Sequence, residues 1–267
     1  MPALQSSRAL PDATLAATAT RGERRASRAA ALLKAGRHDE LVPLEGGARL
    51  VPVFDLDRTL LDCNSATLWV RRQVREGYLS RTKAASMGLK IGPYQLGFGH
   101  VEDAVVAAIR DLRGQNEEEI RQRTIAFWKE EVAHRVRPGA QAVLDAHREL
   151  GEPLVLLTGS SNYMSECVLS ALDMDDALCT RFDVEDGLFT GEGTLCYGDA
   201  KRVAAEAYLA DKDIALSDCA FYTDSYTDLP VMLEVDRPVA VHPDPRLRRH
   251  AQREGWPIED WGVASGV

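Results

Sequence analysis

The chain has 267 residues, enough for one large domain or for one domain that carries a smaller insert. Hydrophobic residues make up 45% of it, which supports a sizeable core and excludes wholesale disorder. Its 41 acidic and 32 basic residues give a net charge of −9, which argues against a protein that binds the phosphate backbone of nucleic acids.

The cysteines and the apolar segments indicate where the protein works. Five cysteines are dispersed along the chain without metal-binding spacing, which is typical of free thiols in a reducing compartment. No apolar run approaches the length of a membrane span, and the N-terminus lacks the apolar core of a secretory signal. We therefore expect a cytoplasmic protein that binds neither membranes nor nucleic acid. Composition does not determine its oligomeric state.

Residues 1–46 differ from the rest of the chain because they are rich in Ala, Arg and Ser. We expect them to form a disordered or loosely helical extension. An organelle-targeting peptide is the alternative, since such peptides are rich in Arg and Ser and poor in acidic residues. Asp12 and Glu23 weaken that alternative only slightly.

Alternating strand and helix patterns begin at Leu50–Phe54, a short apolar run that ends in a polar loop and predicts a buried parallel strand. Pro52 is tolerable there if it lies near the start of the paired segment. Apolar residues at three- and four-residue spacing then predict four helices: Ala66–Arg75, Val101–Leu112, Glu117–Ala133 and Ala140–Leu150. Further predicted strands are Leu154–Leu157, Cys219–Thr223 and Pro238–Val241, and further helices are Asn162–Leu172, Ala200–Leu209 and Leu229–Glu234.

This order predicts an α/β fold with a doubly wound parallel sheet. The helical block between the first and second core strands is then an insert. We predict a core domain of residues 47–62 and 136–267, and a small helical domain of residues 63–135.

Polar loops follow three of the predicted strands, and they hold most of the candidate functional residues. The loops are Asp55-Leu56-Asp57-Arg58-Thr59, Thr158-Gly159-Ser160-Ser161 and Asp224-Ser225-Tyr226-Thr227-Asp228. A single pair of aspartates is weak evidence, because acidic residues and threonines are common in turns. In an open parallel sheet, however, ligands bind outside the carboxyl ends of the strands, so all three loops are expected at one edge.

Four carboxylates at that edge, those of Asp55, Asp57, Asp224 and Asp228, would repel one another and raise one another's pKa values. A hard divalent cation relieves this repulsion, and an all-oxygen ligand set selects Mg²⁺ over zinc. Mg²⁺ binds through one or two carboxylates together with substrate phosphate, so a phosphate ester is the expected substrate.

The phosphoryl oxygens of such a substrate need hydrogen-bond donors and positive charge. Thr158 and the backbone amides of Gly159 and Ser160 are candidate donors. Lys201 is the candidate cation because it lies between the second and third loops in chain order. Taken alone, Lys201 would be read as an ordinary solvated lysine at the start of a helix.

Together these residues resemble the four motifs of the haloacid dehalogenase superfamily, in the branch that contains phosphoserine phosphatase. The motifs occur in order and span about residues 50 to 245: Asp55-x-Asp57-x-Thr59, Thr158, Lys201 and Asp224-Ser-x-x-Asp228. The run Pro238–Pro245 and the later Gly255–Ile258 resemble a bacterial group described as phosphoserine-phosphatase-like or histidinol-phosphatase-like.

The resemblance implies an Mg²⁺-dependent phosphatase with a Rossmann-like core and a helical cap. It implies that Asp55 attacks phosphorus to form an aspartyl-phosphate, and that Asp57 acts as general acid and then as general base. It also implies roles for the remaining motif residues, as follows: metal binding by Asp55, the carbonyl of Asp57, Asp224 and Asp228; phosphate binding by Thr158, Gly159 and Lys201; and support of the loops by Thr59 and Ser225.

The resemblance leaves the substrate open. In phosphoserine phosphatases a glutamate nine residues after the nucleophile contacts the substrate amine, and here that position is Asn64. We therefore expect a small phosphorylated metabolite, with histidinol phosphate as a candidate and phosphoserine disfavoured. Two alternatives use the same residues: a phosphotransferase or mutase that forms the same intermediate, and a non-catalytic protein that binds a phosphorylated ligand.

Overall fold

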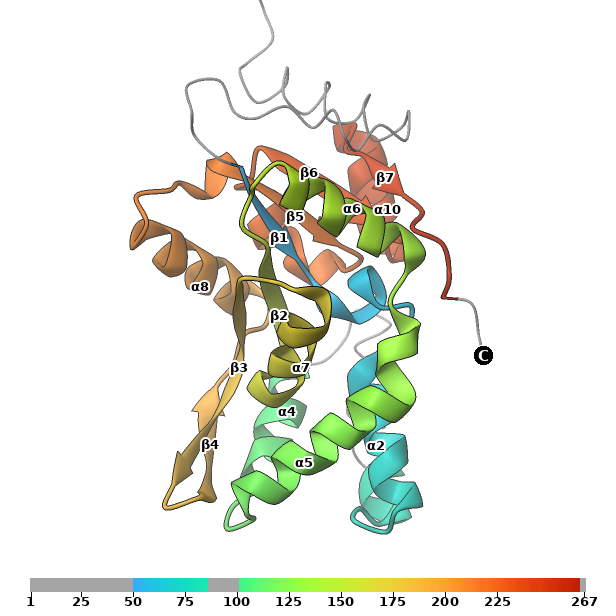
Figure 1. The fold of residues 1–267 in the computed structure, drawn as a ribbon, viewed down its shortest axis with the longest axis vertical. Coiled ribbons are helices and arrows are strands. Elements are labelled where there is room, and N and C mark those ends of the chain that lie inside the picture. The colour runs from blue at the N-terminus through green and yellow to red at the C-terminus, as the bar shows by residue number, and fades with distance from the viewer. Residues whose placement is uncertain (1–49, 86–100, 265–267) are drawn as a thin grey trace, which may run out of the picture.

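The computed structural model describes residues 50–85 and 101–264, so the predicted N-terminal extension, residues 1–46, lies outside the described residues. Within them, the strands form one sheet in the order β4-β3-β2-β1-β5-β6-β7 (Figure 1). The β3–β4 pair is antiparallel and every other neighbouring pair is parallel. The strands are β1 (Val51–Phe54), β2 (Val155–Ser161), β3 (Asp176–Glu185), β4 (Leu188–Thr194), β5 (Cys219–Thr223), β6 (Arg237–Val241) and β7 (Ile258–Glu259). The predicted doubly wound parallel sheet is confirmed, with one antiparallel edge strand.

Helices connect the parallel strands. The α-helices are α2 (Ser65–Arg75), α4 (Val101–Arg110), α5 (Glu117–Phe127), α6 (Pro138–Glu149), α7 (Asn162–Leu172), α8 (Asp199–Ala210), α9 (Leu229–Met232) and α10 (Pro245–Glu254). Shorter or irregular turns are η2 (Leu56–Leu60), η3 (Trp128–Val132), η4 (Ala133–Arg135), η5 (Leu216–Asp218) and η6 (Tyr226–Asp228). No helix in the described ranges is both long enough and apolar enough to cross a membrane.

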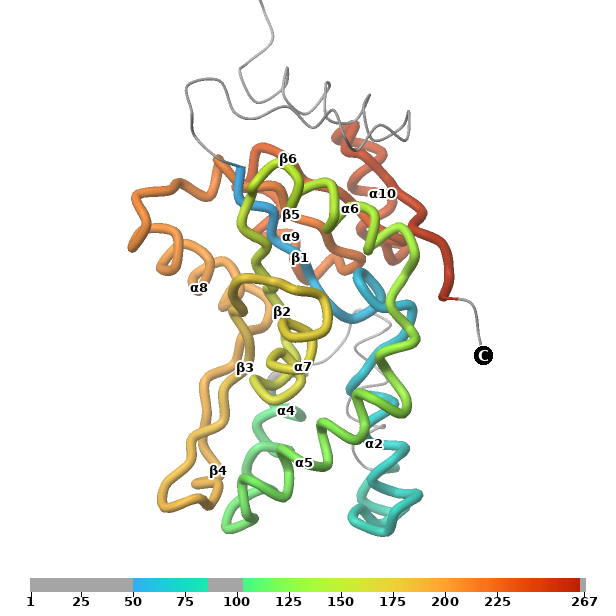
Figure 2. The backbone as a smooth tube through the Cα atoms, in the orientation of Figure 1, coloured from blue at the N-terminus to red at the C-terminus, as the bar shows by residue number. Residues whose placement is uncertain are grey.

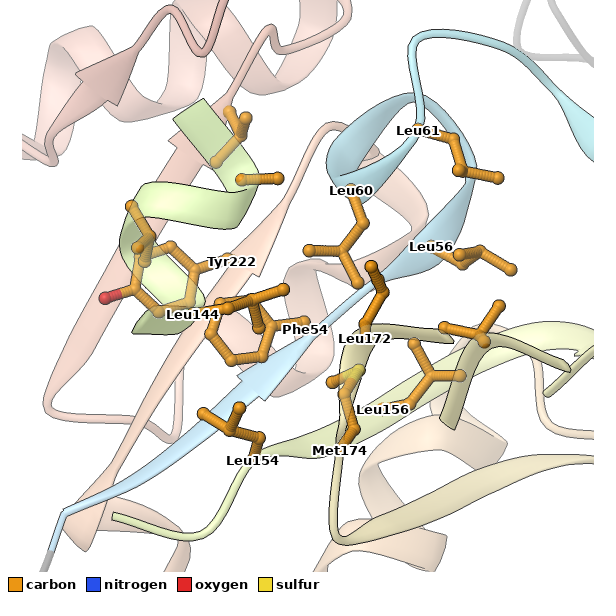
Figure 3. Close-up of a cluster of buried hydrophobic side chains, with 14 of the residues drawn as sticks. Phe54, Leu56, Leu60, Leu61, Leu144, Leu154, Leu156, Leu172, Met174 and Tyr222 are labelled. Carbon is orange, nitrogen blue, oxygen red and sulfur yellow. The ribbon is translucent and has the colours of Figure 1, made fainter. Parts of the chain in front are cut away.

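Two apolar layers cover the sheet. On one face, α6 and α7 pack against side chains such as Phe54, Leu156 and Tyr222 (Figure 3). On the other face, α8, α9 and α10 pack against side chains such as Val53 and Phe221. Adjacent residues of β1 and β5 thus point to opposite layers, as expected for strands buried on both faces. These layers fix the positions of the residues that follow each strand.

The helices α2, α4 and α5 lie between β1 and β2 in the chain, and they occupy the end of the molecule away from α10 (Figure 2). Part of this insert is attached to the core. Tyr163 of α7 donates a hydrogen bond to Glu117 (3.1 Å), Arg121 forms an ion pair with Glu166, and the Gly114 amide donates to a carbonyl of β4 (2.8 Å).

The structure refines several predicted boundaries. Strand β2 extends through Ser161, so Thr158 lies within the strand rather than after it. The helix predicted over Glu117–Ala133 ends at Phe127 and continues as irregular turns. Pro52 is tolerated because the β1–β2 ladder begins only at the next residue, Val53.

Candidate active site

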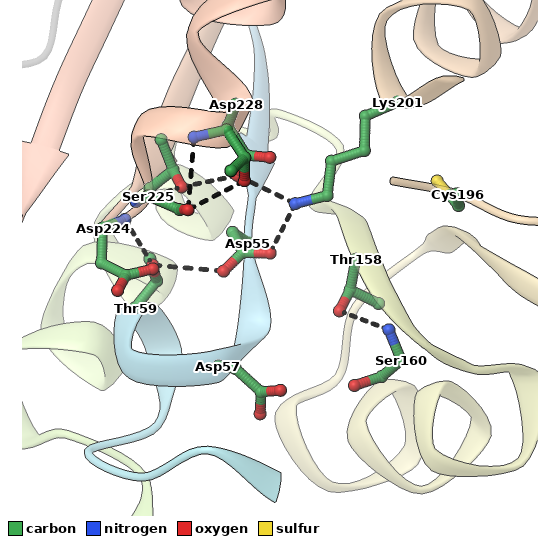
Figure 4. Close-up of polar contacts among 12 residues, drawn as sticks. Asp55, Asp57, Thr59, Thr158, Ser160, Cys196, Lys201, Asp224, Ser225 and Asp228 are labelled. Atoms are coloured by element: carbon green, nitrogen blue, oxygen red, sulfur yellow. Dashed lines mark hydrogen bonds and ion pairs between the residues drawn. The ribbon is translucent and has the colours of Figure 1, made fainter. Parts of the chain in front are cut away.

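Three neighbouring strands bring the predicted loops together. β1 lies between β2 and β5, and Phe54 is in register with Leu156 of β2 and Tyr222 of β5. Asp55 directly follows β1 and Asp224 directly follows β5. Their side chains therefore emerge at the same edge of the sheet, with Thr158 of β2 on the other side of Asp55 (Figure 4).

Thr59 connects the first loop to the third. Its hydroxyl accepts a hydrogen bond from the Asp224 amide (2.9 Å) and lies 3.4 Å from Asp55 Oδ2, to which it donates. Thr59 is fully buried. Thr59, which was expected to support the first loop, thus contacts both Asp55 and Asp224.

Lys201 lies between two aspartates that are far from it in sequence. Its Nζ is 2.7 Å from Asp55 Oδ1 and 2.8 Å from Asp228 Oδ2 (Figure 4). Only 3% of Lys201 is exposed, although it is the third residue of α8. Asp228 Oδ2 also accepts a hydrogen bond from the Thr223 hydroxyl (2.7 Å). Lys201 is therefore not a solvated helix lysine.

Burial dominates the electrostatics of this cluster. It raises the pKa of Asp55 to about 7, against the opposing effect of Lys201 and with a further increase from Asp228. Burial and the charges of Asp55 and Asp228 raise the pKa of Asp224 well above its usual value. Burial would lower the pKa of Lys201, but the two aspartates outweigh that effect and raise it. The site therefore favours a bound cation or added protons.

Asp57 lies on a different side of the loop, at the start of α2. Its Oδ1 accepts a hydrogen bond from the Ser65 amide (2.8 Å), and its Oδ2 lies 3.4 Å from the Asn64 side-chain amide. Burial raises the pKa of Asp57, partly offset by the hydrogen bonds from Ser65. The raised pKa favours the protonated form that a general acid requires.

Asn64 is also the N-cap of α2, where its side chain accepts from the Thr67 amide (2.9 Å). The contacts of Ser65 and Thr223 were not expected from the sequence. Each residue lies next to a residue singled out earlier, Asn64 and Asp224, and that adjacency was the available signal.

The C-terminal half of β2 contributes backbone and hydroxyl groups. Thr158 is buried, and its hydroxyl accepts from the Ser160 amide (3.1 Å). A Cβ on Gly159 would lie 3.3 Å from the Tyr197 ring, so the backbone approaches its neighbour closely here. Ser225 accepts from the Thr227 amide (3.4 Å) and supports the turn that leads to Asp228.

The donors at the site fit a hard cation that relies on few protein ligands. Within residues 50–85 and 101–264, no group of three or more His, Cys, Asp or Glu side chains is arranged to hold a metal by itself. Asp55 and Asp224 supply two carboxylates with raised pKa values, and Asp57 supplies a backbone carbonyl on the same loop. Mg²⁺ commonly takes one or two carboxylates and completes its shell with water and substrate phosphate.

Comparisons with known proteins agree with this geometry. A model of the haloacid dehalogenase-like hydrolase family matches residues 53–233. The chain is 28% identical over 218 residues to a phosphoserine phosphatase of Mycobacterium tuberculosis, covering 79% of this chain and 70% of that protein. It is 24% identical over 213 residues to a histidinol-phosphatase of Neisseria meningitidis serogroup C, covering 77% and 96%. A solved structure of a protein of unknown function from Bordetella pertussis Tohama I superposes with a TM-score of 0.73 at 27% identity, covering 80% of this chain and all of that one.

Proposed function

The chain belongs to the haloacid dehalogenase-like hydrolase family, and relatives of it are named phosphoserine phosphatase and histidinol-phosphatase. We therefore propose that it hydrolyses a small-metabolite phosphate monoester through an aspartyl-phosphate on Asp55. The observation that carries this proposal is the convergence of Asp55, Lys201 and Asp224 at one edge of the sheet. Asp57 lies on the same loop, two positions after the proposed nucleophile.

In the first step, a carboxylate oxygen of Asp55 forms a bond to phosphorus while the ester P–O bond breaks. Asp57 donates its proton to the departing alkoxide, which leaves as the alcohol. In the second step, Asp57 removes a proton from water, and the water oxygen attacks the phosphorus of the aspartyl-phosphate while the bond between the Asp55 oxygen and phosphorus breaks. Inorganic phosphate leaves, and Asp55 and Asp57 return to their starting states.

Lys201 and the C-terminal half of β2 act on the phosphoryl group. The Lys201 ammonium lies 2.7 Å from Asp55 Oδ1, so it favours the ionised nucleophile and is placed to neutralise phosphoryl oxygens bound beside it. We propose that Thr158 and the Gly159 amide donate to the same oxygens. Asp228 and Thr223 hold Lys201 in this position.

We propose that Asp55, the Asp57 carbonyl and Asp224 hold Mg²⁺, with Asp228 contributing through a water because its Oδ2 already accepts from Lys201 and Thr223. When bound, Mg²⁺ would offset the negative charge of the carboxylates and of the substrate phosphate.

We further propose that the helices of residues 63–135 form a cap over the substrate. All five cysteines are free thiols, which supports a cytoplasmic location.

The substrate proposal rests on the contacts of Asn64. Its carbonyl oxygen accepts from Thr67 and its amide faces Asp57, so it presents no carboxylate to a substrate amine. We therefore propose a phosphate ester other than phosphoserine, and we include histidinol phosphate among the candidates because one relative bears that name.

The test is phosphate release with Mg²⁺ from an aryl phosphate, phosphoserine and histidinol phosphate. Asp55→Asn is expected to lower kcat by roughly a thousandfold or more, because it removes the nucleophile. Asp145→Asn, at an exposed position on α6, makes the same chemical change and should leave kcat unaltered. Chelation of Mg²⁺ should stop turnover. Full activity in Asp55→Asn would overturn the nucleophile assignment, and phosphate appearing on an added alcohol would favour a transferase.

A further inference from the structure

The entry to the helical insert and its exit are joined by backbone hydrogen bonds. The Asp62 amide donates to the Arg135 carbonyl and the Arg137 amide donates to the Leu60 carbonyl, each at 2.9 Å. Leu61 and Val136 form an antiparallel bridge between these two bonds. The backbone of Arg137 is therefore fixed beside the loop that carries Asp55 and Asp57.

The Arg137 side chain reaches back into that loop. Its Nε and Nη2 donate to the carbonyl of Arg58 at 3.3 and 3.2 Å, and its Nη1 donates to the carbonyl of Gly262. Only 6% of Arg137 is exposed. A buried guanidinium therefore links the loop to the C-terminal segment of the chain.

Arg58 needs such support because its backbone is strained. Its φ of 62° lies in the left-handed region, which is unfavourable for a residue with a Cβ. Such conformations cost on the order of 1–3 kcal/mol and persist only where the surrounding structure holds them. The side chain of Arg58 is exposed, so backbone contacts must hold it. On the other side, its amide donates to the Cys63 carbonyl at 2.9 Å.

The C-terminal segment is itself anchored. Trp261 is buried, its carbonyl accepts from the Gly139 amide (2.9 Å), and its amide donates to His242 Nε2 (2.8 Å). The Ala264 amide donates to Asp62 Oδ2 at 3.1 Å. Figure 1 shows this segment running beside the start of α6, where Arg137 is located. Gly262 is thus a fixed point from which Arg137 can hold Arg58.

We propose that Arg137 is a positioning residue, which holds the loop from Asp55 to Thr59 in its working shape by tying the Arg58 carbonyl to the C-terminal segment. The assignment rests on the proposed phosphatase function. Arg137 touches no reacting atom in this role. Its planar fork of N–H groups serves two carbonyls at once, which the single ammonium of a lysine does not reproduce.

The test uses Arg137→Gln and Arg137→Lys in the full chain. For both variants, kcat with an aryl phosphate should fall about 10- to 100-fold, as expected when a catalytic group is displaced by about 1 Å, while KM changes little. Arg137→Lys keeps the buried positive charge, so it should fold even if Arg137→Gln does not. Arg249→Gln is the matched control, because Arg249 is exposed on α10, and this variant should leave kcat unchanged.

Hydrogen–deuterium exchange supplies a readout that does not depend on activity. In folded Arg137→Lys, the amides of residues 56–60 should exchange faster than in the wild type, while those of β5 and β6 stay protected. The positioning role would be overturned if residues 56–60 of Arg137→Lys exchanged at the same rate as in the wild type. It would also be overturned if the loss of kcat were no larger than the loss of folded protein. Failure of the phosphatase proposal would instead appear as an inactive wild type, or as full activity in Asp55→Asn.

Discussion

Replacing Lys201 by Met tests whether the buried ammonium holds the active site together. Met is similar in length and apolar, so the substitution removes the charge without opening a large cavity. Asp55 and Asp228 are then left buried without their shared cation, whose Nζ lies 2.7 and 2.8 Å from them. Removing one partner of a buried ion pair typically costs about 3–5 kcal/mol.

Protonation sets an upper limit to that cost for each of the two aspartates. An aspartate can take up a proton instead of remaining charged, and at 1.36 kcal/mol per pH unit above an ordinary pKa of about 3.9 this costs about 5 kcal/mol at pH 7.5. At pH 5 the same calculation yields only about 1.5 kcal/mol. The destabilisation by Lys201→Met should therefore shrink as the pH falls.

The assay is urea unfolding of metal-free protein at pH 7.5 and pH 5. Lys129→Met, which removes an exposed lysine of η3, is the control and should change the unfolding free energy little at either pH. Adding Asp228→Asn to Lys201→Met should recover part of the loss, because one unpaired carboxylate is removed. A loss below about 1 kcal/mol at pH 7.5, or an equal loss at both pH values, would refute the reasoning.

Two further predictions concern the anchor of the C-terminal segment. Burial lowers the pKa of His242 below its ordinary value of 6.5. The charges of Arg137 and Arg248 lower it further, and the charge of Asp260 opposes them. The neutral ring accepts the bond from Trp261, so this contribution to stability is complete above pH 6.5 and is lost as the pH falls through the lowered pKa. Thermal unfolding should show this loss in the wild type and not in His242→Gln, and identical pH profiles would contradict it. Gly139→Ala would place a Cβ 2.6 Å from the Trp261 Cα, so urea unfolding should show a loss of roughly 1–3 kcal/mol, whereas an unchanged midpoint would mean that Trp261 moves freely.

The sequence by itself determined the type of sheet and the edge at which the motif residues gather. Apolar runs such as Cys219–Thr223 are followed at once by polar residues such as Asp224, and parallel strands must place those residues at a common edge. This rule is local, so it holds without knowledge of the order of the strands. The supporting role of Thr59 came instead from the family resemblance, and in the structure its hydroxyl lies 3.4 Å from Asp55 Oδ2.

Only the tertiary structure decided which partners each residue meets. Lys201 is separated from Asp55 by 146 positions, and nothing in its local pattern distinguishes a buried lysine from a solvated one. The contact exists because α8 packs on one face of the sheet, so that Lys201 in its first turn reaches Asp55 at the end of β1 (Figure 4). Arg137 holds Arg58 for a related reason, since the exit from the insert pairs with its entry and the C-terminal segment returns beside both. Such contacts depend on strand order and helix packing, which no short stretch of sequence encodes.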